Sequence, residues 1–501
     1  MSTAAADSGW MEFDDIQGLL RFAYKHHTEA RFLLLRVTNV AAARNWLASV
    51  PVANAVEQDK LPPTVLQIAL TYEGMVALGV PADIAGGFSQ ELIVGMSGDA
   101  NRSRLLGDLG PNDPAQWQWG NGDRIPHVAV LLYALPGLLD TWSRQIEAQY
   151  AAGFQLIVSL STADMGGIEP FGFIDGISQP QPDWERRRVV RDETQLAYSN
   201  LSCLGEFLLG YPNEYGLYTP RPLLDSRRDP RGLLPVAEDA PGQRDLGRNG
   251  SYLVWRQLRQ DVAGFWQALD RYAHGQADAR LQLAQALVGR TLYGEPLVGL
   301  PHEAICGNDT SQASLNSFTY RADPEGVRCP LGAHIRRTNP RNADLPPGKS
   351  GPLARLWRML GFNAEARGQD LVASTRFHRL LRRGREYGVR IPLEQALVAG
   401  GDSPESGLHF LCLGANIERQ FEFVQSAWVA NAKFAGLRAE SDPLLGNRCV
   451  GFAGGATDVF TLPQPDGPAC RLEGLPRFTT VLGGGYFFMP GLRALRFLAQ
   501  V

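Results

Sequence analysis

Cysteine is scarce in this sequence, and its distribution excludes several kinds of site. The chain has six cysteines among 501 residues, and none forms a Cys-x-x-Cys pair. Such scattered spacing argues against a zinc ribbon and against a disulfide scaffold. Cys412, inside an apolar segment, is typical of a buried free thiol. We therefore expect a reduced protein of the cytoplasm.

Long apolar runs and an excess of charge are also missing. Apolar stretches such as residues 128–135 are far shorter than the roughly 20 residues that a membrane helix needs. Residues 1–10 lack the basic and apolar regions of a secretory signal. The formal net charge of -4 gives no reason to expect nucleic acid as a partner, and no basic run resembles a patch for binding an anionic membrane. We expect neither as a partner.

Apolar spacing in the first third of the chain predicts two successive βαβ units. In the split βαβ, or ferredoxin-like, pattern such units form an antiparallel sheet covered by helices. The predicted strands are residues 30–37, 64–71, 127–135 and 153–160, and the predicted helices are residues 41–50, 72–78 and 138–151.

The same pattern returns later in the chain. A strand at 250–258 precedes a helix at 262–272, and a strand at 407–413 precedes an amphipathic helix at 416–429. The Gly- and Pro-rich segments 206–249 and 322–352 are too long for simple connections, so we expect them to cover a functional site. We predict an α+β protein of two ferredoxin-like halves with antiparallel sheets, divided into residues 1–205 and 206–501.

One carboxylate occupies an unusually apolar segment. Asp175 lies in the sequence Phe-Gly-Phe-Ile-Asp-Gly-Ile-Ser-Gln-Pro, residues 171–180, with Gly172 and Gly176 close by. A carboxylate among apolar neighbours must find a partner or raise its pKa. Two glycines permit a sharp turn and a close approach to the backbone. The segment suits an acid–base residue held over a cofactor.

Two further clusters contain histidine or arginine. His334 follows Gly332 and Ala333 and precedes three arginines within seven positions, an arrangement that suits a single haem ligand with arginines for acidic groups. A capped helix start with a solvated basic face is the alternative. The second cluster surrounds Arg382 and Arg383, and its spacing alone favours a basic surface helix ending at Gly384.

Taken together, these three clusters resemble the dye-decolorizing peroxidases, a family that binds haem b. Residues 172–176 match the family's GxxDG motif, and residues 334–341 resemble its proximal-histidine segment. Residues 380–388 resemble the distal-arginine segment and place the essential arginine at Arg382 rather than Arg383. Residues 407–410 resemble the strand that lines the distal pocket, with Leu408 and Phe410 as its apolar members.

The resemblance covers almost the whole chain, because residues 16–20 and 485–490 also fit. Length and a loop-rich middle resemble the longer cytoplasmic bacterial subgroup. One position departs from the shorter members, which have asparagine where this chain has Gly384. Peroxide chemistry is therefore expected to depend on Asp175 and Arg382.

The resemblance implies one haem b per chain, bound mainly in the C-terminal half, with His334 as the proximal iron ligand. Asp442 or Glu418 would accept the other ring N–H of His334, and Asp442 is preferred because of its place in the motif order. Arg336 would contact the acidic groups of the haem. Asp175 would move a proton within hydrogen peroxide while Arg382 stabilises the developing charge.

The expected products of this chemistry are a ferryl–porphyrin radical and then oxidised aromatic, phenolic or dye-like donors, each losing one electron. Large donors cannot reach a buried haem, so Tyr387 and Trp428 are candidates for relaying electrons from the surface. Two other functions are open: a haem carrier or iron-releasing protein with weak turnover, and a non-catalytic interaction protein. The chain is also compatible with a homo-oligomer.

Overall fold

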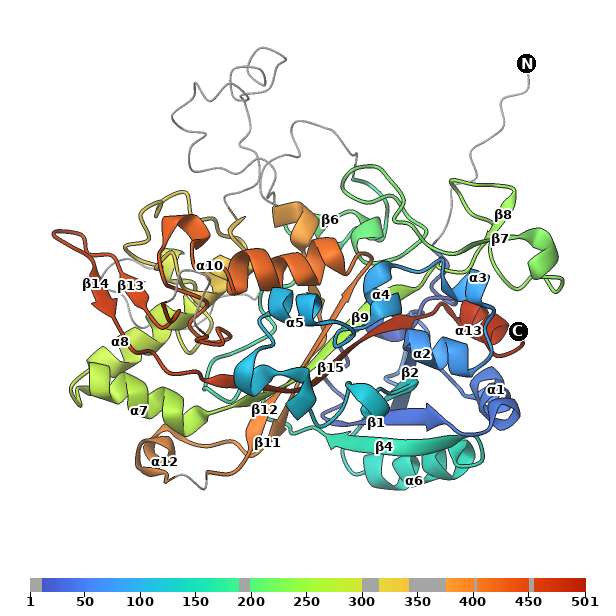
Figure 1. The fold of residues 1–501 in the computed structure, drawn as a ribbon, viewed down its shortest axis with the longest axis horizontal. Helices are drawn as coiled ribbons and strands as arrows, with labels where there is room; N and C mark the ends of the chain where they lie inside the picture. Colours follow the sequence, from blue (N-terminus) through green and yellow to red (C-terminus); the bar gives the residue numbers. More distant parts are fainter. Residues whose placement is uncertain (1–10, 189–198, 300–314, 342–374, 401–402, 450–454) are drawn as a thin grey trace, which may run out of the picture.

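The computed structural model describes residues 11–188, 199–299, 315–341, 375–400, 403–449 and 455–501. Their centre is one nine-stranded antiparallel sheet of strand order β10-β12-β9-β15-β2-β3-β1-β4, with β11 also paired to β12. Figure 1 shows the strands β1, β2 and β4, in blue and teal, at one end of this sheet and the strands β11 and β12, in orange, toward the other. The predicted α+β class with antiparallel strands is confirmed.

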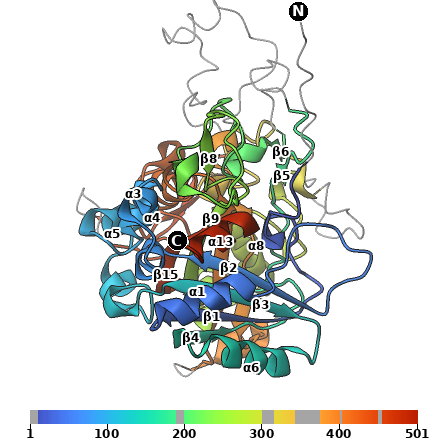
Figure 2. The same ribbon diagram turned by 90° about the vertical axis from the view of Figure 1, so that its right-hand side faces the viewer.

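The first half has the predicted ferredoxin-like strand order, β4-β1-β3-β2. All seven predicted elements are present to within one residue at each end. Strand β3 is buried along its whole length because its alternate side chains pack into two apolar cores, one on each face of the sheet. Helix α6 packs against β1 and β3 (Figure 2). The elements are β1 (Glu29–Val37), α1 (Val40–Ser49), β2 (Thr64–Leu70), α2 (Tyr72–Ala77), α3 (Ala82–Ala85), α4 (Gln90–Val94), α5 (Ala100–Leu106), β3 (Val128–Ala134), α6 (Leu139–Tyr150) and β4 (Phe154–Ser161).

The second half repeats this order. Counted along the chain, its strands are β9, then β10 with β11, then β12, then β15, and across the sheet the fourth lies beside the first, the first beside the third and the third beside the second. The helix predicted at 416–429 is present as two consecutive π-helical segments, Glu418–Glu422 and Val424–Val429. The main elements are β9 (Ser251–Gln260), α7 (Val262–Tyr272), α8 (Ala277–Val288), α10 (His334–Thr338), β10 (Leu381–Arg382), β11 (Arg385–Gly388), α12 (Leu393–Val398), β12 (Ser406–Gly414), β15 (Thr479–Met489) and α13 (Leu492–Leu498).

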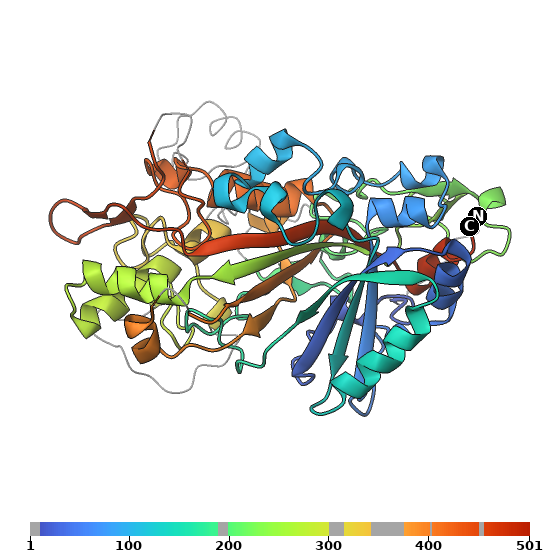
Figure 3. The ribbon, with the colours of Figure 1, turned by 60° about the horizontal axis from the view of Figure 1, so that its bottom comes forward.

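The two strand sets meet along a narrow seam. Strand β15 pairs extensively with β9 but with β2 only through Phe488 and Leu70. The buried side chain of Gln17 spans the seam, because its amide donates to the carbonyls of Ile68 (2.8 Å) and Pro490 (2.9 Å). Figure 3 shows β15, in red, running across the middle of the molecule beside the blue and teal strands.

The basic segment that includes Arg382 is not the helix that its spacing alone suggested. It forms a 3-10 turn at Thr375–His378 and then the short strands β10 and β11. The alternation of a strand sends consecutive side chains to opposite faces. Gly384 lies between the two strands, where a Cβ atom would stand 2.8 Å from the carbonyl oxygen of His409 on β12. The absence of a side chain therefore lets this segment pair closely with β12.

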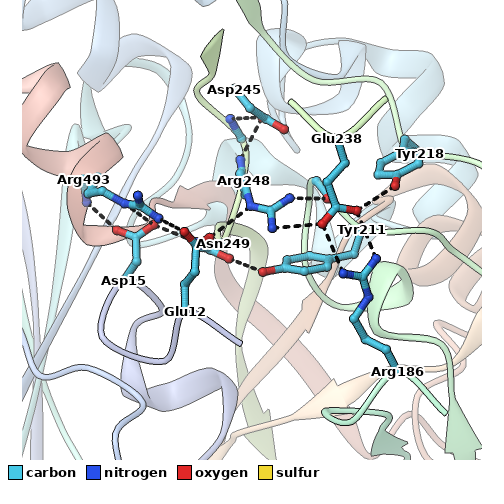
Figure 4. A network of polar contacts seen from close by, with 12 residues as sticks. Glu12, Asp15, Arg186, Tyr211, Tyr218, Glu238, Asp245, Arg248, Asn249 and Arg493 are labelled. Carbon is cyan, nitrogen blue, oxygen red and sulfur yellow. Dashed lines mark hydrogen bonds and ion pairs between the residues drawn. The ribbon is translucent and has the colours of Figure 1, made fainter. Parts of the chain in front are cut away.

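An ion-pair network fastens the long loop 206–249 to both ends of the described chain (Figure 4). Glu12 accepts hydrogen bonds from Arg248 (3.0 Å) and Asn249 (2.9 Å), and it also pairs with Arg493 of α13. Asn249 donates in addition to Asp15 (2.7 Å). Burial favours the protonated form of Glu12, but these hydrogen bonds outweigh it and hold its pKa at about 2. The network therefore depends on an ionised Glu12.

Loop 206–249 contains its own small hairpin, β7 (Leu223–Asp225) with β8 (Gln243–Asp245). The other loop singled out from the sequence, 322–352, lies partly outside the described residues. Within the described ranges, no helix is both long and apolar enough to cross a membrane.

Candidate active site

One cavity brings together most of the residues that the sequence singled out. It lies between the second strand set and the helices α8, α10 and Glu418–Val429, and the 169–180 loop of the first half closes it. His334, Asp175, Arg382, Leu408 and Phe410 all line it. Most of its other walls are apolar, from Leu258, Val288, Phe421, Leu444 and Val481 among others.

His334 is the first residue of α10, and a buried carboxylate fixes its ring. Its Nδ1 lies 2.9 Å from Oδ2 of Asp442, a fully buried side chain. Burial would raise the pKa of Asp442, but His334 outweighs it and holds that pKa below its usual range. An ionised carboxylate only accepts hydrogen bonds, so Nδ1 must carry the proton. In the neutral ring the other nitrogen keeps its lone pair on the cavity side, although, against the effect of burial, the charge of Asp442 raises the pKa of His334 above its usual value.

Asp442 is itself held by a tight turn. Its Oδ1 accepts the backbone N–H groups of Leu444 (2.9 Å) and Leu445 (2.8 Å), a local pattern that aspartate favours. Glu418, the other candidate partner of His334, is exposed on the late helix and does not line the cavity. The structure thus places Asp442, not Glu418, against the histidine.

Asp175 finds the partner that its apolar surroundings required. Nη1 of Arg382 lies 2.9 Å from its Oδ1. Burial alone would raise the pKa of Asp175, but the charge of Arg382 and the backbone N–H of Gly176 hold it below its usual value. Gly172 and Gly176, both with positive φ, form the turn that presents the carboxylate. Asp175 is therefore ionised at neutral pH.

Gln179 fixes the position of Arg382 beside Asp175, a role that was not predicted from the sequence. Its Oε1 accepts the backbone N–H of Arg382 (3.0 Å), and its Nε2 donates to the carbonyl of Arg382 (3.2 Å). Arg383 points the other way, where it donates to the carbonyls of Leu19 (2.7 Å) and Leu20 (3.1 Å). Arg382 reaches the cavity, whereas Arg383 anchors the strand to the N-terminal segment.

A second carboxylate, Glu169, lines the cavity and was also missed. It accepts the backbone N–H groups of Phe171 and Phe173, each at 3.0 Å, and the side-chain amide of Gln260 at 2.7 Å. Burial raises its pKa to about 7. Its hydrogen bonds close the turn that carries Asp175.

Arg336 does not line the cavity. Its guanidinium is buried against Asp323 (3.2 Å) and the carbonyl of Cys329 (2.7 Å), where it braces the loop before α10. Arg290 lies at the cavity instead, and its partners are neutral, including the hydroxyl of Ser178 at 2.7 Å. Burial and the nearby Arg341 lower the pKa of Arg290 to about 10. A negative group placed here would be stabilised.

The two aromatic side chains considered as relays are both buried. Tyr387 is 6% exposed and packs on the ring of His409, and Trp428 is 5% exposed and lines the cavity. An open cleft bordered by Lys25, Arg385 and Glu386 meets the cavity at Asp175 and Arg382. It gives small molecules a route from solvent to this pair.

Comparison with known structures identifies the class of fold. The chain superposes on a DyP-type peroxidase from the fungus Auricularia auricula-judae with a TM-score of 0.72 at 23% identity, over 98% of this chain and 100% of the other. The DyP-type peroxidase of Anabaena sp. gives a TM-score of 0.67 at 22% identity, over 97% and 94% of the two chains. The fold is therefore that of the dye-decolorizing peroxidases.

Proteins with similar sequences are also named as dye peroxidases. The multifunctional dye peroxidase DyP2 of Amycolatopsis sp. is 29% identical over 463 residues, which cover 88% of this chain and 85% of the relative. The dye-decolorizing peroxidase of Mycena epipterygia is 26% identical over 527 residues, or 98% and 87% of the two chains. No family model matches the sequence. The chain is thus similar over nearly its whole length to dye-decolorizing peroxidases.

Proposed function

We propose that this protein is a haem b peroxidase that reduces hydrogen peroxide and oxidises bulky aromatic, phenolic or dye-like donors by one-electron steps. One observation carries the proposal. A histidine–carboxylate pair, His334 with Asp442, and a carboxylate–arginine pair, Asp175 with Arg382, line the same apolar cavity. Iron ligation requires the first pair, and acid–base chemistry on peroxide requires the second.

The chemistry of the cavity fits a haem. The free ring nitrogen of His334 would ligate the iron, and Leu408 and Phe410 would contact the apolar macrocycle. Arg290 and Asn316 line its polar edge and would hold the propionate groups. When bound, the haem supplies the iron at which peroxide is reduced. Because the site has one such histidine, we propose one haem per chain.

Asp175 and Arg382 have separate roles in the reduction of peroxide. Asp175 is ionised, so it can take a proton from one peroxide oxygen and return it to the other. Arg382 lies beside it and stabilises negative charge as the O–O bond breaks. Gln179 keeps the guanidinium in place through the backbone of Arg382. Arg336 supports the proximal helix instead of contacting the haem.

The decisive test is an optical spectrum of the purified, haem-supplemented protein before and after one equivalent of hydrogen peroxide. We expect a Soret band that shifts on adding peroxide and returns on adding a phenolic donor. A band that does not respond to peroxide would favour the haem carrier, and no band at all would exclude both haem functions. The cytoplasmic location, the bacterial subgroup, the division at residue 205 and a homo-oligomer stay predictions.

A further inference from the structure

Arg448 brings a positive charge to the turn that carries Asp442. Its Nη1 donates to the main-chain carbonyl of Asp442 (2.9 Å) and to the hydroxyl of Ser441 (3.0 Å), and its Nη2 donates to the carbonyl of Pro443 (2.7 Å). Its Nε donates to the carbonyl of Pro476 at 3.3 Å. These acceptors are all neutral, so the cation is held without an ion pair to any residue in the described ranges.

The local backbone is shaped around this guanidinium. Arg448 itself has a φ of 59°, in the left-handed region that residues other than glycine rarely occupy. A Cβ atom at Gly446 would collide with Nη1 of Arg448 and would stand 2.6 Å from the carbonyl oxygen of Asp442. The chain therefore accepts an unfavourable backbone conformation, and needs a glycine two positions earlier, to bring the guanidinium against Asp442.

Arg448 is charged, and its charge acts on Asp442. Burial lowers the pKa of Arg448 to about 10, which still leaves the side chain protonated at neutral pH. Of the carboxylates that favour its charged form, Asp442 has the largest effect. A second buried arginine, Arg337, adds to the effect of His334 in lowering the pKa of Asp442. Two cations therefore face the carboxylate that holds His334.

The hydrogen bond between Asp442 and His334 is left intact by this arrangement. Oδ2 of Asp442 faces Nδ1 of His334 and Oδ1 accepts two backbone N–H groups, while Arg448 bonds to the main-chain carbonyl instead. An ionised carboxylate behind a haem ligand makes the histidine electron-rich, which favours ferric iron. A positive charge beside that carboxylate opposes this effect, and it also repels the extra positive charge of ferric iron. Both effects favour the ferrous form.

We propose that Arg448 is a positioning residue that raises the Fe(III)/Fe(II) reduction potential of the haem by holding a positive charge beside Asp442, an inference that rests on the haem site proposed above. In this couple ferric iron gains one electron and becomes ferrous, and no other reactant takes part. A higher potential makes the peroxide-oxidised haem a stronger acceptor of electrons. Arg448 thereby extends the proposed peroxidase to donors that are harder to oxidise.

The test measures the haem potential of the wild type and of Arg448→Gln, Arg448→Met, Arg448→Lys and Arg44→Met. Each haem-loaded protein is reduced stepwise with dithionite at neutral pH in the presence of redox-indicator dyes, and the Soret band gives the ferrous fraction. Glutamine and methionine remove the charge, whereas lysine keeps it with fewer hydrogen bonds. Arg44 is the matched control: it lies on α1, outside the cavity lining, and its guanidinium is likewise held by a carbonyl, that of Leu78 at 2.8 Å.

The two neutral variants should favour the ferric form by about tenfold or more, which is a shift of about 59 mV or more to lower potential. Arg448→Lys and Arg44→Met should stay within about threefold of the wild-type equilibrium. A folded neutral variant with the wild-type potential would overturn the proposal. So would an equal shift in Arg448→Lys, because lost hydrogen bonds would then explain both. Failure of both neutral variants to fold, judged by thermal melting, would assign Arg448 to stability alone and would also overturn it.

The measurement uses no peroxide, so its result is independent of turnover. A wild type whose Soret band does not respond to peroxide would overturn the peroxidase function and leave the result for Arg448 standing. A wild type with no Soret band after haem supplementation would overturn the haem site on which both depend.

Discussion

Replacing Asp442 by asparagine tests which nitrogen of His334 faces the cavity. In the native turn, Oδ1 of Asp442 accepts two backbone N–H groups and Oδ2 accepts Nδ1–H of His334. Asparagine has one oxygen for these three donors. Leaving the two buried N–H groups unpaired would cost about 1–3 kcal/mol each, so the amide oxygen should stay with the backbone. Its NH2 group then faces His334.

An NH2 group in that position forces Nδ1 to accept a hydrogen bond, which moves the ring proton to the nitrogen that faces the cavity. That nitrogen can then no longer ligate iron without losing its proton. Changes to such supporting partners reduce metal affinity or activity by about 10–100-fold. At about 1.4 kcal/mol per tenfold, the expected loss of haem-binding free energy in Asp442→Asn is about 1.4–2.8 kcal/mol.

The assay is a titration of the haem-free protein with haemin, followed at the Soret band, with a thermal melting curve to show that the variant is folded. Glu418→Gln serves as the control, because this exposed carboxylate contributes nothing to the cavity and its loss should leave haem affinity unchanged. A folded Asp442→Asn variant that binds haem as tightly as the wild type would refute the assignment of the ring proton.

Three further predictions concern Asp175 and Arg382 at the cavity and the ion-pair network around Glu12. Arg382→Leu should keep haem, and stopped-flow spectra should show a reaction with peroxide about 100–1,000-fold slower, because the charge beside Asp175 is lost; a wild-type rate would reject Arg382. Asp175 has a lowered pKa, so activity should fall as pH drops through that pKa, and the pH–rate profile of Asp175→Asn should lack this acid limb. Glu12 titrates near 2 when folded and near 4.5 when unfolded, so its contribution to stability is complete above about pH 4.5 and lost toward pH 2. Its upper limit is about 3 kcal/mol, reduced by partial exposure, and denaturant unfolding of Glu12→Gln should show correspondingly less acid dependence; equal pH slopes for the two proteins would contradict this account.

Strong periodicity made much of the fold predictable. Seven strands and helices of the first half have clear apolar spacing, and their bounds were expected to within one residue, whereas the short helices α3, α4 and α5 were not predicted. Strand β15 was not foreseen, because Gly483, Gly484 and Gly485 interrupt it and weaken the strand signal. These glycines serve packing: a Cβ atom at Gly483 would stand 2.5 Å from Nε1 of Trp119. Sequence spacing alone does not reveal such a partner.

A site residue was predictable from the sequence when it belongs to a recognisable motif. It was not predictable when only tertiary contacts bring it to the cavity. The contact between Asp175 and Arg382 spans 207 positions, and only the family resemblance linked them beforehand. Arg336 shares a short basic segment with other arginines, and spacing cannot tell which of them turns toward the cavity. Arg290 lies far from every motif, so its place at the cavity becomes visible only in the folded chain.

The narrow seam between the two strand sets bears on the order of assembly. Gln17 and Pro490 meet across it although 473 positions separate them, and contacts of such long range form slowly. Val481 on β15 lines the cavity, so the haem pocket has its full wall only after this strand has inserted between β9 and β2. Until then both neighbouring strands present open edges that can pair with other chains. Haem capture should therefore be a late event in folding, and the interval before it is when aggregation competes most strongly.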